Sequence, residues 1–415
     1  MKKQFRGRVL AALLVGTALV AAACGSSSKN NNASSGTTVA PATGTPLVIG
    51  QVATQVSATV TSTQAVDAMD TWVKWTNDHG GIAGHPVKII VEDDKGDPAV
   101  GLAAVKDLVE NKHVIALVGD SAGSTEQTWA DYIKSKRIPV IGDAYIDALW
   151  FTNPMFYPLG ATVITQIWGQ MKSAALAGGT KVASFLCTEA AACAQAQPII
   201  AAEAKAAGLD IVVNDLASGT QASYTAECLK AKNAGADTIA NEVNPTVLPK
   251  DCGRQNYHPI YINADMSPTP AIIKASPEGG NASGATPDFP CRKTDIPAAK
   301  DFYSAISKYH PEWWIGGSKN DQFASVFCNA WISGAGFKLA IERAAVAASA
   351  TATNEDVIKG LATFNNEIVA GLTAPVTLSD GTKPNPQQKC VFLYRWKGAS
   401  SFNGLPADAS PTCMP

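Results

Sequence analysis

Short β-branched segments alternate with amphipathic helical segments along most of this chain, and this alternation constrains the fold more than any other feature. Residues 47–50 predict a strand, and apolar side chains at 65–73 recur at the spacing of one helix face. A second strand is predicted at 87–91, and Asp97 and Pro98 then mark the start of another helix. Strands that alternate with helices form parallel sheets with helices on both faces, so we expect a doubly wound α/β fold.

The same alternation occurs twice, first through residues 47–141 and again through residues 182–263. About 370 residues follow the polar segment at 25–45, which is more than one hydrophobic core usually serves. We therefore expect two α/β lobes. The segment rich in Pro and Gly at 276–297 is expected to be a crossing or a loop between them.

Residues 1–23 are expected to be a signal peptide. Four basic residues precede an apolar run at 9–23, which is shorter than the roughly 20 residues of a membrane-spanning helix. Residues 20–24 resemble a bacterial lipobox, which implies that Cys24 carries a lipid and that residues 24–45 form a flexible tether. We therefore expect an extracytoplasmic protein that is anchored to the cell membrane by lipid.

Eight cysteines remain besides Cys24, and export to an oxidising compartment predicts that they form disulfides. We expect neighbours in the sequence to pair. The candidates are Cys187, Cys193, Cys228, Cys252, Cys291, Cys328, Cys390 and Cys413.

No metal site and no cofactor are expected, because the cysteines form no CxxC motif and the five histidines are scattered. The acidic residues Glu92, Asp93, Asp94 and Asp97 are interpreted as a helix cap and a solvated strand end. The net charge is −2 and no basic cluster follows the leader, which argues against a nucleic-acid partner.

Residues 119–123 match GxSxG, the nucleophile elbow of serine hydrolases, with Ser121 as the nucleophile. A simpler interpretation is preferred, because residues 124–127 match a helix capping box that accounts for the segment. A serine esterase is therefore kept only as the less favoured alternative, and we do not expect an enzyme.

Residues 77–84 (NDHGGIAG), the strand at 87–91, and the acidic residues that follow it resemble the N-G-G-I-x-G … D-D-x-x-D-P signature of type I periplasmic binding proteins. The nearest branch is the leucine/isoleucine/valine-binding group of ABC-transporter receptors. The resemblance implies two lobes that are joined by three crossings and close over a ligand. It implies an N-terminal lobe of 46–160 plus 291–380, a C-terminal lobe of 161–290 plus 381–415, and crossings near 159–165, 284–296 and 375–388.

Ligands of open parallel sheets bind beyond the carboxyl ends of the strands. In the amino-acid-binding members, the loops that correspond to 121–125 and 143–147 hold the ligand carboxylate, and an acid matching Asp265 holds the ammonium. The candidate ligand-binding residues are Ser121, Gly123, Ser124, Asp143, Ala144, Tyr145, Glu189, Asn244 and Asp265.

Two departures from the family pattern argue against a branched-chain amino acid. Ala144-Tyr145 stands where the family has Ala-Thr, and the loop at 188–192 lacks the usual tyrosine. Acidic residues also lie on the loops of the expected cleft, namely Asp120, Asp143, Glu189, Glu242 and Asp265. We therefore expect a cationic or neutral polar solute, an amino acid or a related compound, that is passed to ABC permease subunits in the membrane. The alternative is an extracellular sensor with the same fold.

Overall fold

A computed structural model describes residues 40–56, 62–122, 125–142, 148–189, 191–263, 269–398 and 402–415. The predicted signal peptide, Cys24 and most of the tether lie outside this part of the chain. None of the helices in the described ranges is both long enough and apolar enough to cross a membrane.

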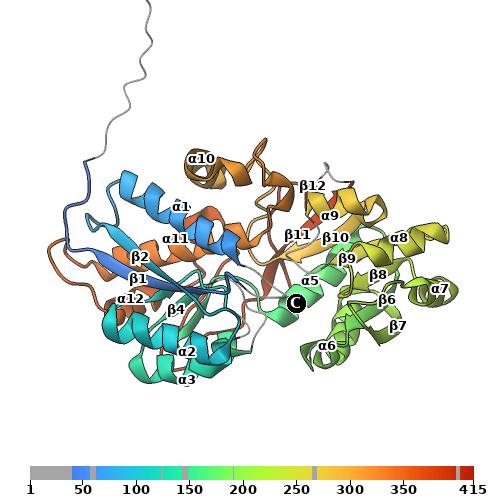
Figure 1. Ribbon diagram of the computed structural model, residues 1–415, viewed down its shortest axis with the longest axis horizontal. Helices are drawn as coiled ribbons and strands as arrows, with labels where there is room; N and C mark the ends of the chain where they lie inside the picture. Colours follow the sequence, from blue (N-terminus) through green and yellow to red (C-terminus); the bar gives the residue numbers. More distant parts are fainter. Residues whose placement is uncertain are drawn as a thin grey trace, which may run out of the picture. The chain divides into compact units, whose positions relative to one another are not determined.

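The first sheet has five parallel strands in the order β2-β1-β3-β4-β5 (Figure 1). Its strands are β1 (Leu47–Ala53), β2 (Val87–Asp93), β3 (Leu117–Val118), β4 (Val140–Gly142) and β5 (Phe156–Pro158). The helices of this part are α1 (Thr63–Asp78), α2 (Pro98–Lys106), α3 (Glu126–Lys136), α4 (Leu149–Thr152), α10 (Lys300–Tyr309), α11 (Val326–Ala344) and α12 (Asn354–Leu361). One hydrophobic core joins residues 47–159 to residues 289–378.

The second sheet has the order β12-β11-β10-β9-β8-β6-β7, with β13 paired to β11. Its strands are β6 (Lys181–Cys187), β7 (Asp210–Ala217), β8 (Thr238–Asn241), β9 (Ile260–Asn263), β10 (Asn281–Thr286), β11 (Cys390–Lys397), β12 (Phe402–Leu405) and β13 (Thr412–Cys413). Its helices are α5 (Val163–Leu176), α6 (Ala191–Ala207), α7 (Thr225–Asn233), α8 (Val247–Arg254) and α9 (Pro270–Ala275). Separate cores cover its two faces.

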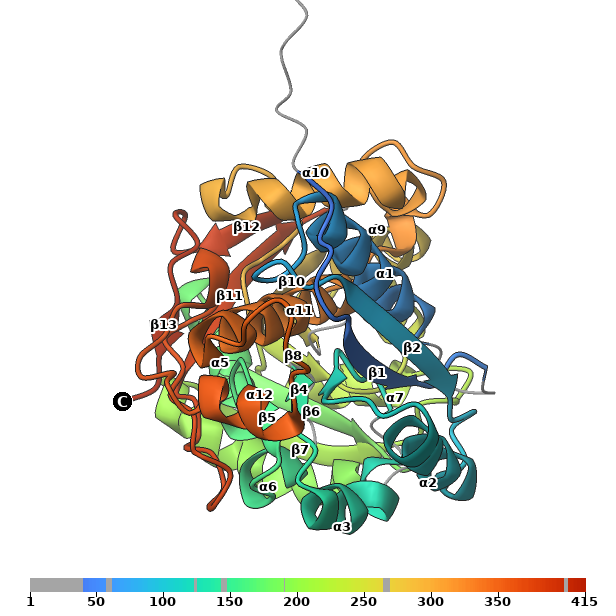
Figure 2. The same cartoon turned by 90° about the vertical axis from the view of Figure 1, so that its left-hand side faces the viewer.

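Short irregular turns complete the described elements. A π-helical turn covers Asp107–Asn111, and 3₁₀ turns cover Pro277–Gly280, Pro297–Ala299, Pro311–Trp313, Asn320–Gln322 and Val369–Gly371. The chain passes between the two sheets after β5, after β10 and again before β11. In Figure 2 the C-terminal strands, in red, lie beside β10.

The expectation of parallel strands is correct for the first sheet and for β6 to β10, but it is wrong for the end of the chain. Strands β11 and β12 each run antiparallel to their neighbours. Only residues 398–401 connect them, and a connection that short joins antiparallel strands, whereas parallel strands need a long crossover.

The expected loop at 276–297 contains strand β10. Its residues are small, and all but the first are buried. Gly169 of α5 lies so close that a Cβ placed there would be 2.9 Å from the Cβ of Ala285. Small side chains therefore allow the helix to approach this strand, and their low strand propensity concealed the strand in the sequence.

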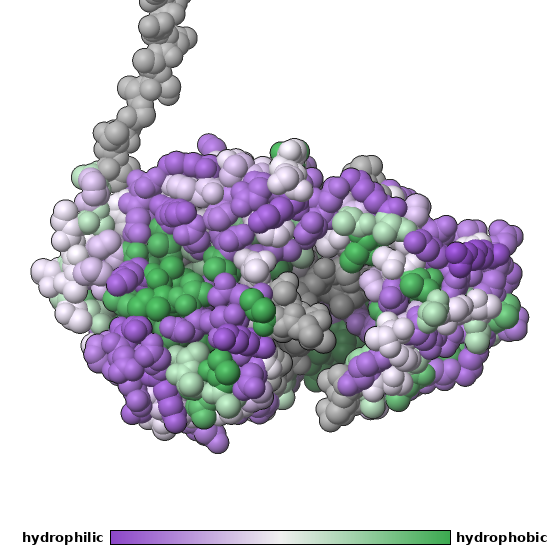
Figure 3. All heavy atoms as spheres, in the orientation of Figure 1, coloured by the Kyte–Doolittle hydropathy of each residue, from purple (hydrophilic) through white to green (hydrophobic). Residues whose placement is uncertain are grey.

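The edge strand β2 carries partly exposed Ile89 and Ile90, and apolar surface lies over this region in Figure 3. Exposed Lys88 and acidic Asp93 lie near the two ends of the strand. Charged residues on an edge strand oppose pairing with another chain.

Four disulfides join sequence neighbours, which confirms the expected pairing. Cys228–Cys252 links α7 to α8, and Cys390–Cys413 links β11 to β13. Cys291–Cys328 joins the segment after β10 to α11. Cys187–Cys193 closes the loop between β6 and α6.

Candidate ligand-binding site

The carboxyl ends of β1 and β3 meet at one group of polar side chains. Ser121 pairs with Ala53 as an isolated bridge, and its backbone N–H donates to the carbonyl of Val52. The Ser121 hydroxyl donates to the hydroxyl of Ser62 over 2.9 Å. Ser62 directly precedes α1 and makes no side-chain cap of that helix. Two hydroxyls therefore lie beside a helix N-terminus, where backbone N–H groups remain for a polar ligand.

Asp120 is buried next to this group, with only 4% of its surface exposed. Its Oδ1 accepts a hydrogen bond from the Val52 N–H over 2.8 Å, while Oδ2 has no partner among the described residues. Burial raises the pKa of Asp120 to about 7, more than the Val52 bond lowers it. The carboxyl group lines a small cavity against Asn329 and Ser333 of α11.

The interpretation of Asp94 as part of a solvated strand end is wrong. It is fully buried, and its carboxylate accepts hydrogen bonds from Thr54 and from Thr125, each over 2.7 Å. Thr125 precedes α3 and makes no side-chain cap of that helix, and Ser124 of the expected capping box lies outside the described residues. Asp94 therefore ties the loops after β1 and β3 together, whereas Asp97 caps α2 as predicted.

In the second sheet, the acidic loop residues have different environments. Glu189 accepts hydrogen bonds from the Ser218 hydroxyl and the Gly219 N–H, which lower its pKa to about 2. Glu242 directly follows β8, and burial raises its pKa to about 7. Glu189 is therefore an ionised brace between two loops, while Glu242 changes charge near neutral pH.

Asn244 also has a local structural role. Its Oδ1 accepts hydrogen bonds from the backbone N–H groups of Thr246 and Val247, at the start of α8.

The other candidate residues lie outside the described part of the chain, namely Gly123, Ser124, Asp143, Ala144, Tyr145 and Asp265. The structure thus brings Ser121 together with Ser62, which sequence reasoning missed. The only signal for Ser62 was a serine at a helix start.

A second hollow lies between the segment after β10, the residues just before α11, and strands β11 and β12. The Arg292 guanidinium lies over the rings of Phe323, at 5.2 Å, and Trp396, at 5.8 Å. It also donates to the carbonyls of Asn320 and Phe323. Tyr394 lines the same hollow. Arg292 therefore links a segment packed in the first core to a strand of the second sheet through cation–π contacts and hydrogen bonds.

Two helix-covered sheets, three connecting passages and polar groups at the carboxyl ends of strands define a class of two-lobed ligand receptors. The sequence profile of the periplasmic binding protein family matches residues 46–401, so the chain belongs to this family. It is a binding protein and not an enzyme. The Ser121 hydroxyl, which the GxSxG motif suggested as a nucleophile, donates to a serine rather than to a histidine. The four disulfides fit an extracytoplasmic location.

Solved structures show the same fold at low sequence identity. A branched-chain amino acid ABC transporter protein from Thermus thermophilus with bound valine matches with a TM-score of 0.72 and 17% identity, covering 89% of this chain and 97% of that one. An ABC transporter substrate-binding protein from Aeropyrum pernix matches with a TM-score of 0.68 and 16% identity, covering 89% of this chain and 96% of that one. A leucine-binding protein from Thermotoga maritima matches with a TM-score of 0.64 and 13% identity, covering 86% of this chain and 97% of that one. No curated protein matches the chain by sequence.

Proposed function

We propose that this protein is the extracytoplasmic receptor of an ABC uptake transporter and that it captures a small polar solute, an amino acid or a related compound. Family membership supports a binding role, and the solved structures with this fold include transporter receptors. The observation that carries the proposal is the pair of hydroxyls, Ser62 and Ser121, beside the N-terminus of α1. Such a group binds a carboxylate or another anionic or polar end of a ligand.

The solute would bind between an N-terminal lobe of 46–160 plus 291–380 and a C-terminal lobe of 161–290 plus 381–415. Glu242 supports a ligand that also carries a hydrogen-bond donor, because a partly buried carboxyl with a pKa of about 7 accepts from such a group when ionised. Gly123, Ser124, Asp143, Ala144, Tyr145 and Asp265 are proposed as further contacts from the neighbouring loops.

A thermal-shift screen of amino acids, amides, polyamines and urea-like solutes is expected to find a ligand that raises the melting temperature. A ligand at 100 times its Kd stabilises the native state by about 2.7 kcal/mol. Calorimetry should then show about tenfold weaker binding for Ser121→Ala and Glu242→Gln, because each loses one polar contact of about 1.4 kcal/mol. Ser135→Ala changes an exposed serine on α3 and should bind like the wild type. Equal affinity in all three variants would place the solute elsewhere.

We also propose that Cys24 carries the lipid that holds the receptor at the membrane. The apolar run before Cys24 and the polar tether after it support this role. Labelled palmitate is expected to enter the wild-type protein in cells and to be absent from Cys24→Ala, which should be released in soluble form. Label that persists in the variant would rule out attachment at this residue.

A further inference from the structure

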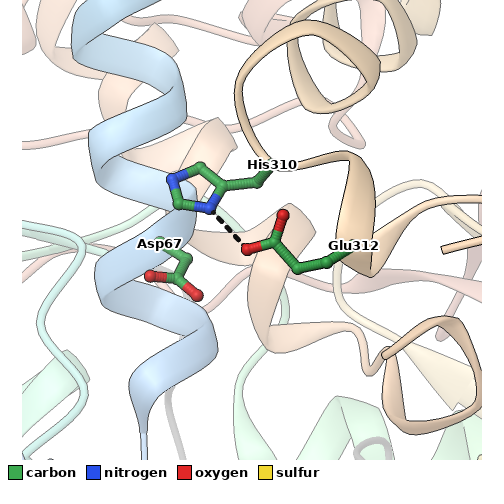
Figure 4. A group of neighbouring side chains, drawn as sticks. All are labelled: Asp67, His310 and Glu312. Atoms are coloured by element: carbon green, nitrogen blue, oxygen red, sulfur yellow. Dashed lines mark hydrogen bonds and ion pairs between the residues drawn. The ribbon is translucent and has the colours of Figure 1, made fainter. Parts of the chain in front are cut away.

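A group of ligating side chains lies between α1 and the turn that follows α10. Asp67 and Asp70 are one turn apart on α1, so both face the same neighbour. Helix α10 ends at Tyr309, His310 follows as its C-cap residue, and the 3₁₀ turn Pro311–Trp313 carries Glu312 back toward α1. Figure 4 shows Asp67, His310 and Glu312 directed toward one another from these two segments.

Both ring nitrogens of His310 face a carboxylate. Nδ1 lies 3.1 Å from Oε1 of Glu312, and Nε2 lies 2.9 Å from Oδ2 of Asp70. A neutral imidazole has one N–H and one lone pair, so it can donate to only one of these carboxylates. The other contact is satisfied either when the ring carries a second proton or when a cation lies between the lone pair and the carboxylate.

The geometry around Nδ1 is close to that of a metal site. One ligand atom from each of Asp67, His310 and Glu312 lies within 4.8 Å of the others. Zinc bonds to nitrogen and oxygen are about 2.0–2.1 Å long, which places tetrahedral ligands about 3.3 Å apart. The 3.1 Å separation of Nδ1 and Glu312 fits this value. The Asp67 carboxylate needs to move by up to about 1.5 Å to complete the set, from within 4.8 Å to about 3.3 Å.

Hydrogen bonds outside the group orient two of the three ligands. In the tautomer that carries its proton on Nε2, Asp70 accepts that proton and the Nδ1 lone pair faces Glu312. The Trp313 indole N–H donates to Oδ2 of Asp67 over 2.7 Å, which leaves Oδ1 for an ion. Metal-binding histidines and carboxylates in proteins are commonly held by such bonds.

The surroundings also suit a dication. Lys74 pairs with Asp70, at 2.6 Å, rather than with the ligands themselves. The His310 side chain is 16% exposed and that of Glu312 is 32% exposed, so an ion can enter and keep a water ligand.

We propose that Asp67, His310 and Glu312 bind one zinc ion, with water in the fourth position. Imidazole with carboxylates is a ligand set that zinc accepts, and three protein ligands leave an open position. The ion would join the turn after α10 to α1. Its ligands are distinct from the residues of the candidate solute site.

The test is calorimetric titration of the chelator-treated full-length protein with zinc chloride at pH 7.5. One zinc ion is expected to bind with micromolar affinity. His310→Gln should weaken binding at least about 100-fold, and Asp70→Asn should weaken it about tenfold because the imidazole loses its orientation. His258→Gln replaces an exposed histidine after α8 and should bind zinc like the wild type.

Glu312→Gln provides a second variant at a partly exposed position, which keeps the test valid if His310→Gln fails to fold. It should also reduce zinc affinity while its circular dichroism spectrum remains that of the wild type. Failure of the wild type to bind zinc would overturn the proposal. So would unchanged zinc affinity in folded His310→Gln or Glu312→Gln. A bound solute found by thermal shift would not affect either result.

Discussion

Replacing Gly360 with alanine is expected to lower the free energy of unfolding by about 4 kcal/mol, at the upper end of single substitutions. Local propensity predicts the opposite, because alanine in a helix interior is about 0.5–1 kcal/mol more favourable than glycine. The packing of α12 against α11 reverses the sign of the expected change in stability. A Cβ on Gly360 would lie 1.9 Å from the carbonyl oxygen of Ala340 and 2.5 Å from its carbonyl carbon. Both are backbone atoms, so a side-chain rotation cannot relieve the clash and the helices must separate.

Urea unfolding, followed by circular dichroism, measures this effect. Lys359→Ala is the matched control, because Lys359 is exposed on the same helix and its replacement should change stability by about 0.5 kcal/mol or less. If Gly360→Ala were as stable as Lys359→Ala, the close approach of α11 and α12 would not contribute to stability.

The stability of the protein is expected to fall as the pH rises from about 4 to about 7, because of Asp120. Burial raises its pKa from 3.8 to about 7 in the folded chain. Between these values the folded state holds a proton that the unfolded state has released, so increasing pH favours unfolding. At about 1.36 kcal/mol per pKa unit, the loss reaches about 4 kcal/mol and is complete above pH 7.

Asp120→Asn removes this titration and keeps an oxygen for the Val52 N–H. We expect the variant to be more stable than the wild type at pH 8 and to lose most of that advantage at pH 5. Urea titrations at the two pH values give the difference directly. Asp131→Asn alters an exposed aspartate on α3 and should follow the wild type at both pH values. A difference between Asp120→Asn and the wild type that is the same at pH 5 and pH 8 would contradict the assignment.

A gain in stability from Asp120→Asn would also bear on function. A carboxyl group that is buried without a full set of partners destabilises the chain, and residues of this kind are often retained for binding or catalysis. Asp120 directly precedes Ser121 in the candidate solute site.

Most of the strands and helices could be predicted from the sequence, because their signals are local. The β-branched run that forms β1, the Asp97 cap with Pro98, and the alternation of strand with helix each depend on neighbouring residues. That the cysteines form disulfides was also accessible, since export supplies the oxidising compartment, whereas the structure decided that neighbours pair. The antiparallel pairing of β11 and the strand β10 were not accessible, because both depend on which distant segment lies alongside.

The candidate site also combines features that the local sequence predicts with features that depend on long-range packing. The loop containing Ser121 follows from strand order, whereas its bond to Ser62 depends on how α1 packs over the sheet. Asp94 and Asp97 are close in sequence. Asp94 is nevertheless buried and accepts hydrogen bonds from two threonines, whereas Asp97 caps a helix.

The sequence by itself determined the fold class and the family, because periodicity, caps and ordered motifs are properties of short segments. Only the tertiary structure decided the sign of a substitution at Gly360, the protonation of Asp120, and the meeting of His310 with Asp67 and Asp70 across 240 positions of sequence. The physical reason is that steric overlap, desolvation and metal coordination depend on the distances between atoms, and long-range packing sets those distances.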